Sequence, residues 1–332
     1  MMRNPLGEGV AGVATPGREI LVLGELDVVR LLDPAALLDE LAEGFRALTR
    51  AEVQTPDRPE VAVPDFGFLL AMPAWRRGAY ITVKMVSVFE GNAALDLPSH
   101  LAVINLFDPV SGAPVCVMDG TYITGLRTAA CAILSVRELA RQDARIATIV
   151  GAGVQGREHL KLLPLVRDFD EIRIFSLYRD DAETLARLHP AARAVDDIEM
   201  ALRDSDVVCL CSHAREPVID AGWVRPGTHV SSVGYAPPRG ELPAELARRN
   251  TLYVETMTAF AEPPIGCAEL RGVPPAHAIE LGALLMGSQP GRVAADQITV
   301  YKAMGIAMED MVAANLVFAE AQRLGIGQKT ML

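Results

Sequence analysis

The sequence predicts an α/β fold in which a doubly wound parallel sheet is inserted into an α+β domain. Three observations point to this architecture. From residue 146 onward, short apolar runs alternate with helical segments, the pattern of a parallel sheet covered by helices. Between residues 61 and 117, β-type runs are separated by Gly, Pro and Asn, as in an antiparallel sheet. Residues 296–324 read as a long helical region, broken near Gly305, that returns to the first domain.

The first part of the chain is expected to carry two helices around its antiparallel sheet. Asp33 can cap a helix at 33–49, and Pro34 suits its first position. One face of this helix is apolar: Leu37, Leu38, Leu41, Phe45 and Leu48. A second helix is expected at 124–141. The first 12 residues lack the apolar core of a signal peptide, so we expect a loose tail there.

In the second part, parallel strands and helices are expected to alternate up to about residue 254, and a Pro- and Gly-rich irregular segment, 262–290, follows. The expected strands are 146–150, 172–177, 207–212, 228–233 and 252–254. The expected helices lie near 155–166, 180–188, 197–203 and 243–248.

Composition excludes several classes of function. The chain has 332 residues, and its 42 acidic and 31 basic side chains give a net charge of −11, which argues against nucleic-acid or anionic-membrane partners. No apolar run is long enough to span a membrane, so we expect a cytoplasmic protein. The five cysteines and six histidines show no metal-ligand spacing, so no metal is predicted and the cysteines are expected in the core.

A complete G-x-G-x-x-G motif follows the apolar run 146–150 directly and opens a helix. Gly151 permits the tight turn, Gly153 lets the backbone approach a pyrophosphate, and Gly156 lets the helix pack on the strand. This order predicts a Rossmann domain that binds a dinucleotide on the helix N-terminus. The alternative is a glycine turn with only a structural role.

The end of the second parallel strand chooses between NAD and NADP, because an acid there binds the ribose 2′-OH and repels a 2′-phosphate. Here the segment reads E-I-R-I-F-S-L-Y-R-D, with Ser176 at the expected position of the acid and Arg179 just beyond. We therefore favour NADP(H), with NAD(H) as the other possibility. The alternative for Arg179 is an ordinary solvated charge.

Four polar residues before the glycine motif suggest a substrate site: Arg58, Lys84, Ser99 and Arg127. Lys84 lies in an apolar strand and Arg127 in a helix of small apolar residues, where an unpaired charge is costly. Several cations near a nicotinamide would bind a carboxylate. The alternative is that each cation forms a structural salt bridge with a nearby Asp or Glu.

Taken together, these segments resemble the ornithine cyclodeaminase/μ-crystallin family. The resemblance rests on V-K-M-V around Lys84, L-P-S-H at 97–100, D-G-T-Y-I-T-G-L-R-T-A-A at 119–130, G-A-G-V-Q-G, V-G-Y-A-P-P-R-G-E-L at 233–242 and D-Q-I-T-V-Y-K-A-M-G-I-A-M-E-D at 296–310. It runs from about residue 20 to residue 327.

The resemblance implies a homodimer with two domains per chain. Residues 1–125 with 306–332 would form the substrate-binding and dimerisation domain, and residues 126–305 the Rossmann domain. Arg58, Lys84 and Arg127 would be the catalytic, carboxylate-binding residues, with Ser99 and Ala236 beside the substrate. The cofactor residues would be Arg127, Thr128, Gly151, Gly153, Val154, Gln155, Gly156, Ser176, Arg179, Ser212, Ser231, Val233, Gly234, Arg239 and Ala303.

Two departures from the family pattern decide the expected chemistry. Cyclodeaminases carry an Asp where this chain has Ala236, and a Glu where it has Leu70. A methyl group cannot accept a proton, so the ring-closing chemistry loses its general base. The expected activity is NAD(P)H-dependent reduction of a small cyclic α-imino acid, such as Δ1-pyrroline-2-carboxylate or Δ1-piperideine-2-carboxylate.

Two alternatives stay open. One is an ornithine cyclodeaminase, or a dehydrogenase acting on open-chain amino acids or opines. The other is a crystallin-like protein that binds NADPH and a small ligand without turnover.

Overall fold

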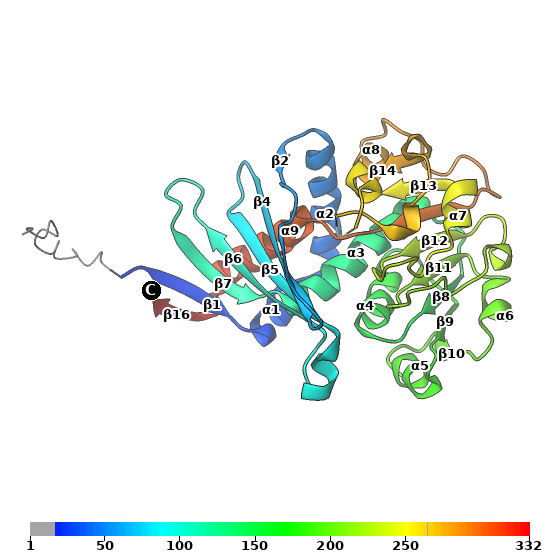
Figure 1. Ribbon diagram of the computed structural model, residues 1–332, viewed down its shortest axis with the longest axis horizontal. Coiled ribbons are helices and arrows are strands. Elements are labelled where there is room, and N and C mark those ends of the chain that lie inside the picture. Colours follow the sequence, from blue (N-terminus) through cyan, green and yellow to red (C-terminus); the bar gives the residue numbers. More distant parts are fainter. Residues whose placement is uncertain (1–16, 264) are drawn as a thin grey trace, which may run out of the picture.

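The computed structural model describes residues 17–263 and 265–332, so the expected N-terminal tail lies outside the described residues. Two large sheets dominate this part of the chain, and helices α2 (Pro34–Thr49), α3 (Thr121–Leu139) and α9 (Ala307–Leu324) lie between them (Figure 1). Helix α9 packs on the first sheet and α3 reaches the second. The α/β class predicted from the sequence is confirmed.

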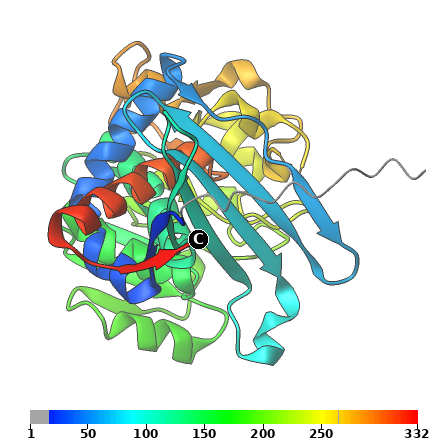
Figure 2. The ribbon, with the colours of Figure 1, turned by 90° about the vertical axis from the view of Figure 1, so that its left-hand side faces the viewer.

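The first sheet has the order β16-β1-β7-β6-β5-β4-β2, and β3 pairs with β4. All its pairings are antiparallel except that of β1 with β7, so the mainly antiparallel prediction for 61–117 is confirmed. Figure 2 shows α2 and α9 together on one side of this sheet. Its strands are β1 (Glu19–Leu23), β2 (Val53–Gln54), β3 (Glu60–Val63), β4 (Gly67–Arg76), β5 (Ile81–Phe89), β6 (His100–Phe107), β7 (Pro114–Asp119) and β16 (Gln328–Met331).

The second sheet is wholly parallel, with the order β10-β9-β8-β11-β12-β15-β13-β14. The five predicted strands all occur, within two residues at each end. From β8 the chain first builds outward to one side and then to the other, which places a topological switch point between β8 and β11. The strands are β8 (Ile146–Val150), β9 (Glu171–Phe175), β10 (Ala192–Ala194), β11 (Val207–Leu210), β12 (His229–Ser232), β13 (Thr251–Val254), β14 (Ala278–Glu280) and β15 (Thr299–Lys302).

One element was predicted wrongly. The segment 296–306 was expected to be helical, but Thr299–Lys302 forms β15, between β12 and β13. All four of its residues are buried. A strand buried on both faces shows neither the helical nor the alternating period, and the β-branched and aromatic residues Thr299, Val300 and Tyr301 were the signal that favoured a strand. Helix α9 begins only at Ala307.

The remaining helices cover the parallel sheet and the chain start. They are α1 (Glu25–Leu31), α4 (Val154–Leu162), α5 (Arg179–Ala186), α6 (Ile198–Leu202), α7 (Ala244–Arg249) and α8 (Leu281–Leu285). Asp33 caps α2 as predicted, since its carboxylate accepts the Ala36 amide at 2.8 Å. The described residues of the segment 262–290 are largely irregular, but they also form β14 and α8.

Helix α3 runs without a break across the predicted domain boundary at 125/126. The division into two domains stays a prediction. All five cysteines are buried and free, in agreement with a packing role. Among the described residues, no helix is long and apolar enough to cross a membrane, and no cluster of His, Cys, Asp and Glu is arranged to hold a metal ion.

Candidate functional site

The glycine turn after β8 has the geometry of a phosphate cradle. Gly151 has φ +119°, and a Cβ there would lie 2.5 Å from the Cys211 carbonyl oxygen. A Cβ on Gly156 would lie 2.1 Å from the Gly151 oxygen, whereas the space beside Gly153 is open. Helix α4 begins directly afterwards without a side-chain cap, so its first amides have no intrahelical acceptor. The turn therefore fits the pyrophosphate of a dinucleotide.

The neighbours of this turn tie it to α3. Gln155 donates from its Nε2 to the Gly125 carbonyl at 3.2 Å, and Thr128 donates to the Thr124 carbonyl at 2.8 Å within α3. Val154 is 66% exposed, so its side chain is free to meet a ligand above the turn. The Gln155 bond fixes the start of α4 against the helix that carries Arg127.

The end of β9 shows where an adenosine ribose would lie. Ser176 is half-buried, and its hydroxyl accepts the Tyr178 amide at 3.3 Å. Arg179 is exposed and forms ion pairs with Glu183, at 2.7 Å, and with Asp196. The alternative for Arg179 was an ordinary solvated charge; the structure shows it exposed and paired with these two carboxylates, so a 2′-phosphate would have to compete with them.

A buried cation cluster lies between α3, β5 and the start of α9. Lys84 points from β5 to Asp310, with 2.7 Å between its Nζ and the carboxylate. Arg127 donates to Asp310 at 3.0 Å and to Glu309 at 2.7 Å. Burial lowers the pKa of Lys84 to about 8, although the Asp310 carboxylate opposes this shift. The salt bridges that the sequence left as an alternative do exist, and Asp310 joins the two cations.

Arg58 approaches the same region from the loop between β2 and β3. Its guanidinium donates to the carbonyl oxygens of Gly305, at 3.3 Å, and Ile265, at 3.2 Å. Burial lowers the pKa of Arg58, and the neighbouring Arg127 acts in the same direction. The structure thus brings the three predicted cations Arg58, Lys84 and Arg127 into one cluster.

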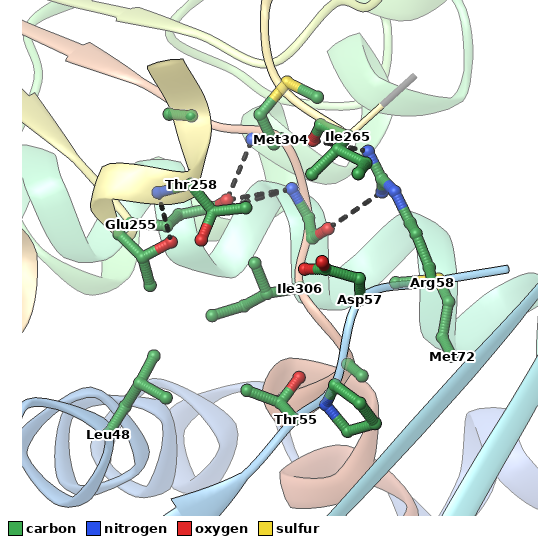
Figure 3. Close-up of a pocket in the computed structure, with 15 residues that line it drawn as sticks. Leu48, Thr55, Asp57, Arg58, Met72, Glu255, Thr258, Ile265, Met304 and Ile306 are labelled. Atoms are coloured by element: carbon green, nitrogen blue, oxygen red, sulfur yellow. Dashed lines mark hydrogen bonds between the residues drawn. The ribbon is translucent and has the colours of Figure 1, made fainter. Parts of the chain in front are cut away.

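Gly305 connects the parts of this cluster. Its carbonyl accepts from Arg58, and its amide donates to Glu255 at 3.0 Å. A Cβ on Gly305 would lie 2.5 Å from Nη1 of Arg127, so only glycine lets the two guanidinium groups lie on either side of this residue. Figure 3 shows Arg58 and Glu255 reaching the Met304–Gly305 turn from opposite sides.

Three carboxyl groups of this cluster were missed by the sequence analysis: Glu255, Glu309 and Asp310. Burial and the adjacent Glu255 raise the pKa of Glu309 well above its ordinary value, because two buried carboxyl groups in contact do not both ionise. Glu255 directly follows β13, and an acid at the carboxyl end of a parallel strand was a usable signal.

The loop after β12 carries the predicted substrate-side residue. Ala236 is buried, and the Pro237–Pro238 bond that follows it is cis. Ser231 is fully buried within β12, so the structure does not expose it to a ligand. Ala303 is buried and donates its amide to the Ser232 carbonyl. Elsewhere in this loop, Val233 donates its amide to the Leu210 carbonyl at 3.2 Å, and Arg239 is exposed and paired with Glu216.

Ser99 is exposed and lies where the segment after β5 meets the loop after β11. Its hydroxyl is 3.0 Å from Nδ1 of His100, and the His100 and His213 rings meet edge to face at 6.3 Å. Glu90 pairs with Arg215 at 3.1 Å across the same boundary. These two histidines were missed by the sequence analysis. Nearby Lys84 and Arg127 help to lower the pKa of His100, after burial and His213.

A pocket of about 180 Å³ opens beside Arg58 (Figure 3). The polar side chains that line it are Thr55, Asp57, Arg58, Glu255, Thr256 and Thr258. Its apolar wall comes from four different elements and their connections and includes Leu48, Met72, Ile265 and Ile306. Met72 is the cross-strand partner of Lys84, so the pocket adjoins the cation cluster.

Comparison with known proteins places this arrangement among related enzymes. Ketimine reductase mu-crystallin of Mus musculus is 35% identical over 270 residues, which cover 80% of this chain and 85% of the mouse protein. The structure of Thermococcus litoralis Δ1-pyrroline-2-carboxylate reductase in complex with NADH and L-proline is 32% identical, with a TM-score of 0.86, and covers 93% of this chain and 99% of that chain.

A third relative is an archaeal alanine dehydrogenase dimer with bound NAD. It is 28% identical, with a TM-score of 0.86, over 94% of this chain and 99% of that chain. The family model of the ornithine cyclodeaminase/mu-crystallin family matches residues 18–324. That match covers most of the chain, so this protein belongs to the ornithine cyclodeaminase/mu-crystallin family.

Proposed function

We propose that this protein is an NAD(P)H-dependent reductase that converts a small cyclic α-imino acid into the L-amino acid. The observation that carries the proposal is the buried cluster of Arg58, Lys84 and Arg127, which lies close to the carboxyl ends of β13 and β15 in the parallel sheet. The related enzymes that reduce ketimines and Δ1-pyrroline-2-carboxylate support it.

The charge of the cluster suits one substrate carboxylate. The raised pKa of Glu309 favours its neutral form, which lowers the negative charge that opposes the positive charge of the three cations. Burial at this site makes that charge effective, because solvent screens it little. The cluster therefore holds the carboxylate and fixes the carbon of the C=N bond for reaction.

The residues of the cluster divide the work of the reaction. A reduced nicotinamide bound beside the loops after β11 and β12 would supply the hydride. Arg58 and Arg127, which offer several N–H donors each, would hold the carboxylate. We assign the proton for the imine nitrogen to Lys84, whose lowered pKa of about 8 makes its ammonium a better donor than an exposed lysine.

This chain lacks the two acidic residues that the resemblance assigns to an ornithine cyclodeaminase. Ala236 and Leu70 both carry apolar side chains that neither accept a proton nor bind an amine. A dehydrogenase of open-chain amino acids remains the second candidate, and the related archaeal alanine dehydrogenase favours it.

For the cofactor we propose NADP(H) over NAD(H). Ser176 brings no negative charge to the ribose, and Arg179 can exchange its surface carboxylates for a phosphate at little cost, because solvent screens exposed ion pairs. The related structures that hold NADH or NAD favour the other cofactor.

We also propose a homodimer formed through the first sheet. The side chains of this sheet that point away from α9 are largely apolar, and Leu69 and Met85 are 36% and 38% exposed. Uncovered apolar strands of this kind commonly mark an interface. The related alanine dehydrogenase is a dimer.

The direct test is NADPH or NADH oxidation with Δ1-pyrroline-2-carboxylate and Δ1-piperideine-2-carboxylate, with L-proline or L-pipecolate identified as product. Pyruvate with ammonia tests the open-chain dehydrogenase, and ornithine with NAD⁺ tests the cyclodeaminase. The proposal is supported if kcat/KM for a cyclic imine is higher than kcat/KM for pyruvate with ammonia and for ornithine. No turnover with either imine would refute it, and would leave ligand binding without catalysis, as a crystallin-like protein would show.

A further inference from the structure

Glu241 is a buried carboxylate at the carboxyl edge of the parallel sheet. Its Oε2 accepts the amide and the hydroxyl of Ser212, at 2.6 and 2.7 Å, and its Oε1 accepts the Ser232 hydroxyl at 2.9 Å and the Gly234 amide at 2.7 Å. Only 1% of Glu241 is exposed. One side chain thereby joins the ends of β11 and β12.

Lys302 completes this arrangement from β15. Its Nζ donates to the Gly234 carbonyl at 2.5 Å and to the Ser232 hydroxyl at 3.2 Å, and it pairs with Glu269 at 2.9 Å. Gly234 is therefore held through both its N–H and its C=O. A Cβ on Gly234 would lie 2.3 Å from the Ser212 oxygen, so the ends of β11, β12 and β15 pack too closely here for any residue but glycine.

A second buried carboxylate at the parallel sheet, Asp206, serves as a comparison for Glu241, because its bonds have a purely structural role. Asp206 lies at the opposite, amino edge, where it accepts the amides of Arg145 and Ile146 and pairs with Arg141 and Arg225. Its counter-ions are partly exposed arginines, and no predicted site residue touches it. Among the described residues no arginine pairs with Glu241, and its side-chain bonds go to Ser212, Ser232 and Gly234 at the ends of β11 and β12.

The place of these bonds indicates their purpose. In a doubly wound sheet the dinucleotide crosses the switch point, here between β8 and β11. The glycine turn after β8 would take the pyrophosphate and the end of β9 the adenosine ribose, so the ends of β11 and β12 are left for the nicotinamide half. Ser212 and Gly234 lie at these ends.

We infer that Glu241 and Lys302 are positioning residues that hold the ends of β11 and β12 in the shape that receives the nicotinamide half of the cofactor. This inference rests on the proposed dinucleotide-dependent function. Both residues act through Ser212, Ser232 and Gly234 and need not touch the reacting atoms.

The test compares two ligands that differ only at the nicotinamide end, NADH and ADP-ribose, by calorimetric titration of the full chain. Glu241→Gln keeps the shape of the side chain, but its NH₂ group cannot accept the N–H or O–H donors that face it. We expect the affinity for NADH to fall about tenfold, because hydrogen bonds to a charged carboxylate are lost at the strand ends that receive the nicotinamide half. The affinity for ADP-ribose, which lacks the nicotinamide, should stay within about twofold. Asp206→Asn is the matched control, and we expect it to lower the melting temperature while leaving both affinities unchanged.

Each outcome has a separate meaning. If the unmodified protein binds neither NADH nor NADPH, the proposed function fails. If it binds NADPH alone, the same comparison is made between NADPH and 2′-phospho-ADP-ribose. If it binds NADH and ADP-ribose, and Glu241→Gln weakens both equally or weakens neither, the positioning role is wrong. Should Glu241→Gln not fold, Ser232→Ala is the second variant, because it removes one bond to Glu241 and the contact with Lys302. We expect it to lower the affinity for NADH about threefold and to leave the affinity for ADP-ribose unchanged. If Ser232→Ala binds NADH as tightly as the unmodified protein does, the inference is overturned.

Discussion

Gly305→Ala is expected to damage the cation cluster while leaving the fold in place. Gly305 has φ +73°, and an added Cβ would lie 2.5, 2.9 and 3.1 Å from Nη1, Nη2 and Cζ of Arg127. Ordinary contacts begin at 3.4 Å, so the guanidinium must withdraw by about 0.9 Å. Arg127 has little freedom to do so, because Glu309 and Asp310 hold it at 2.7 and 3.0 Å.

The magnitude follows from this displacement. A misplacement of about 1 Å in a substrate-positioning group lowers kcat/KM by about 100-fold. The left-handed backbone of an alanine adds about 1–2 kcal/mol of destabilisation, which a chain with a core of this size can absorb. We therefore expect a folded variant whose kcat/KM for the cyclic imine is reduced about 100-fold.

Gly272→Ala separates the two effects. Gly272 has φ +74°, almost the same as Gly305, but a Cβ there meets nothing within 4 Å. Its alanine variant should show the same loss of melting temperature with unchanged kcat/KM in the NADPH- or NADH-oxidation assay. The reasoning is refuted if Gly305→Ala keeps its kcat/KM, or if Gly272→Ala loses activity to a similar extent.

Three further variants test other parts of the site. Because the pKa of Lys84 is lowered to about 8, its ammonium is present below that pH and lost above it, so kcat/KM for imine reduction should decline above pH 8. Lys84→Met should abolish that step in the pH profile and lower kcat by about 100-fold or more, whereas Lys161→Met, on the exposed side of α4, should do neither. Arg179→Ala should lower the ratio of kcat/KM for NADPH over NADH by about tenfold, and an unchanged ratio would exclude Arg179 from 2′-phosphate binding. Met85→Glu places a charge on the outward face of the first sheet and should convert a dimer into a monomer in light-scattering measurements; a monomeric unmodified protein, or a variant that stays dimeric, would show that the chain does not pair through this face.

Much of the fold could be predicted because its signals are local. The cap at Asp33, the apolar stripe of α2 and the glycine motif after β8 each depend on neighbouring residues, and the structure contains all three. The strand at Thr299–Lys302 was missed because its burial comes from β12 and β13, more than 40 residues away in the chain. Burial on both faces erased the period that a local analysis needs.

The site could be predicted only in part for the same reason. Lys84 and Arg127 stood out because each is a charge in an apolar segment. Their partner Asp310 lies on the last helix, more than 180 residues beyond either cation, and no local pattern joins it to them. Glu241 was equally inconspicuous, since its four bonds reach two separate strand ends.

The central claim is that this protein transfers a hydride from a nicotinamide cofactor to the carbon of a C=N bond in a cyclic imino acid. The most direct measurement supplies cofactor deuterated at both C4 positions, with Δ1-pyrroline-2-carboxylate, and examines the product by NMR. We predict L-proline with one deuterium on its α-carbon. Proline without deuterium at that carbon, or no proline at all, would contradict the claim.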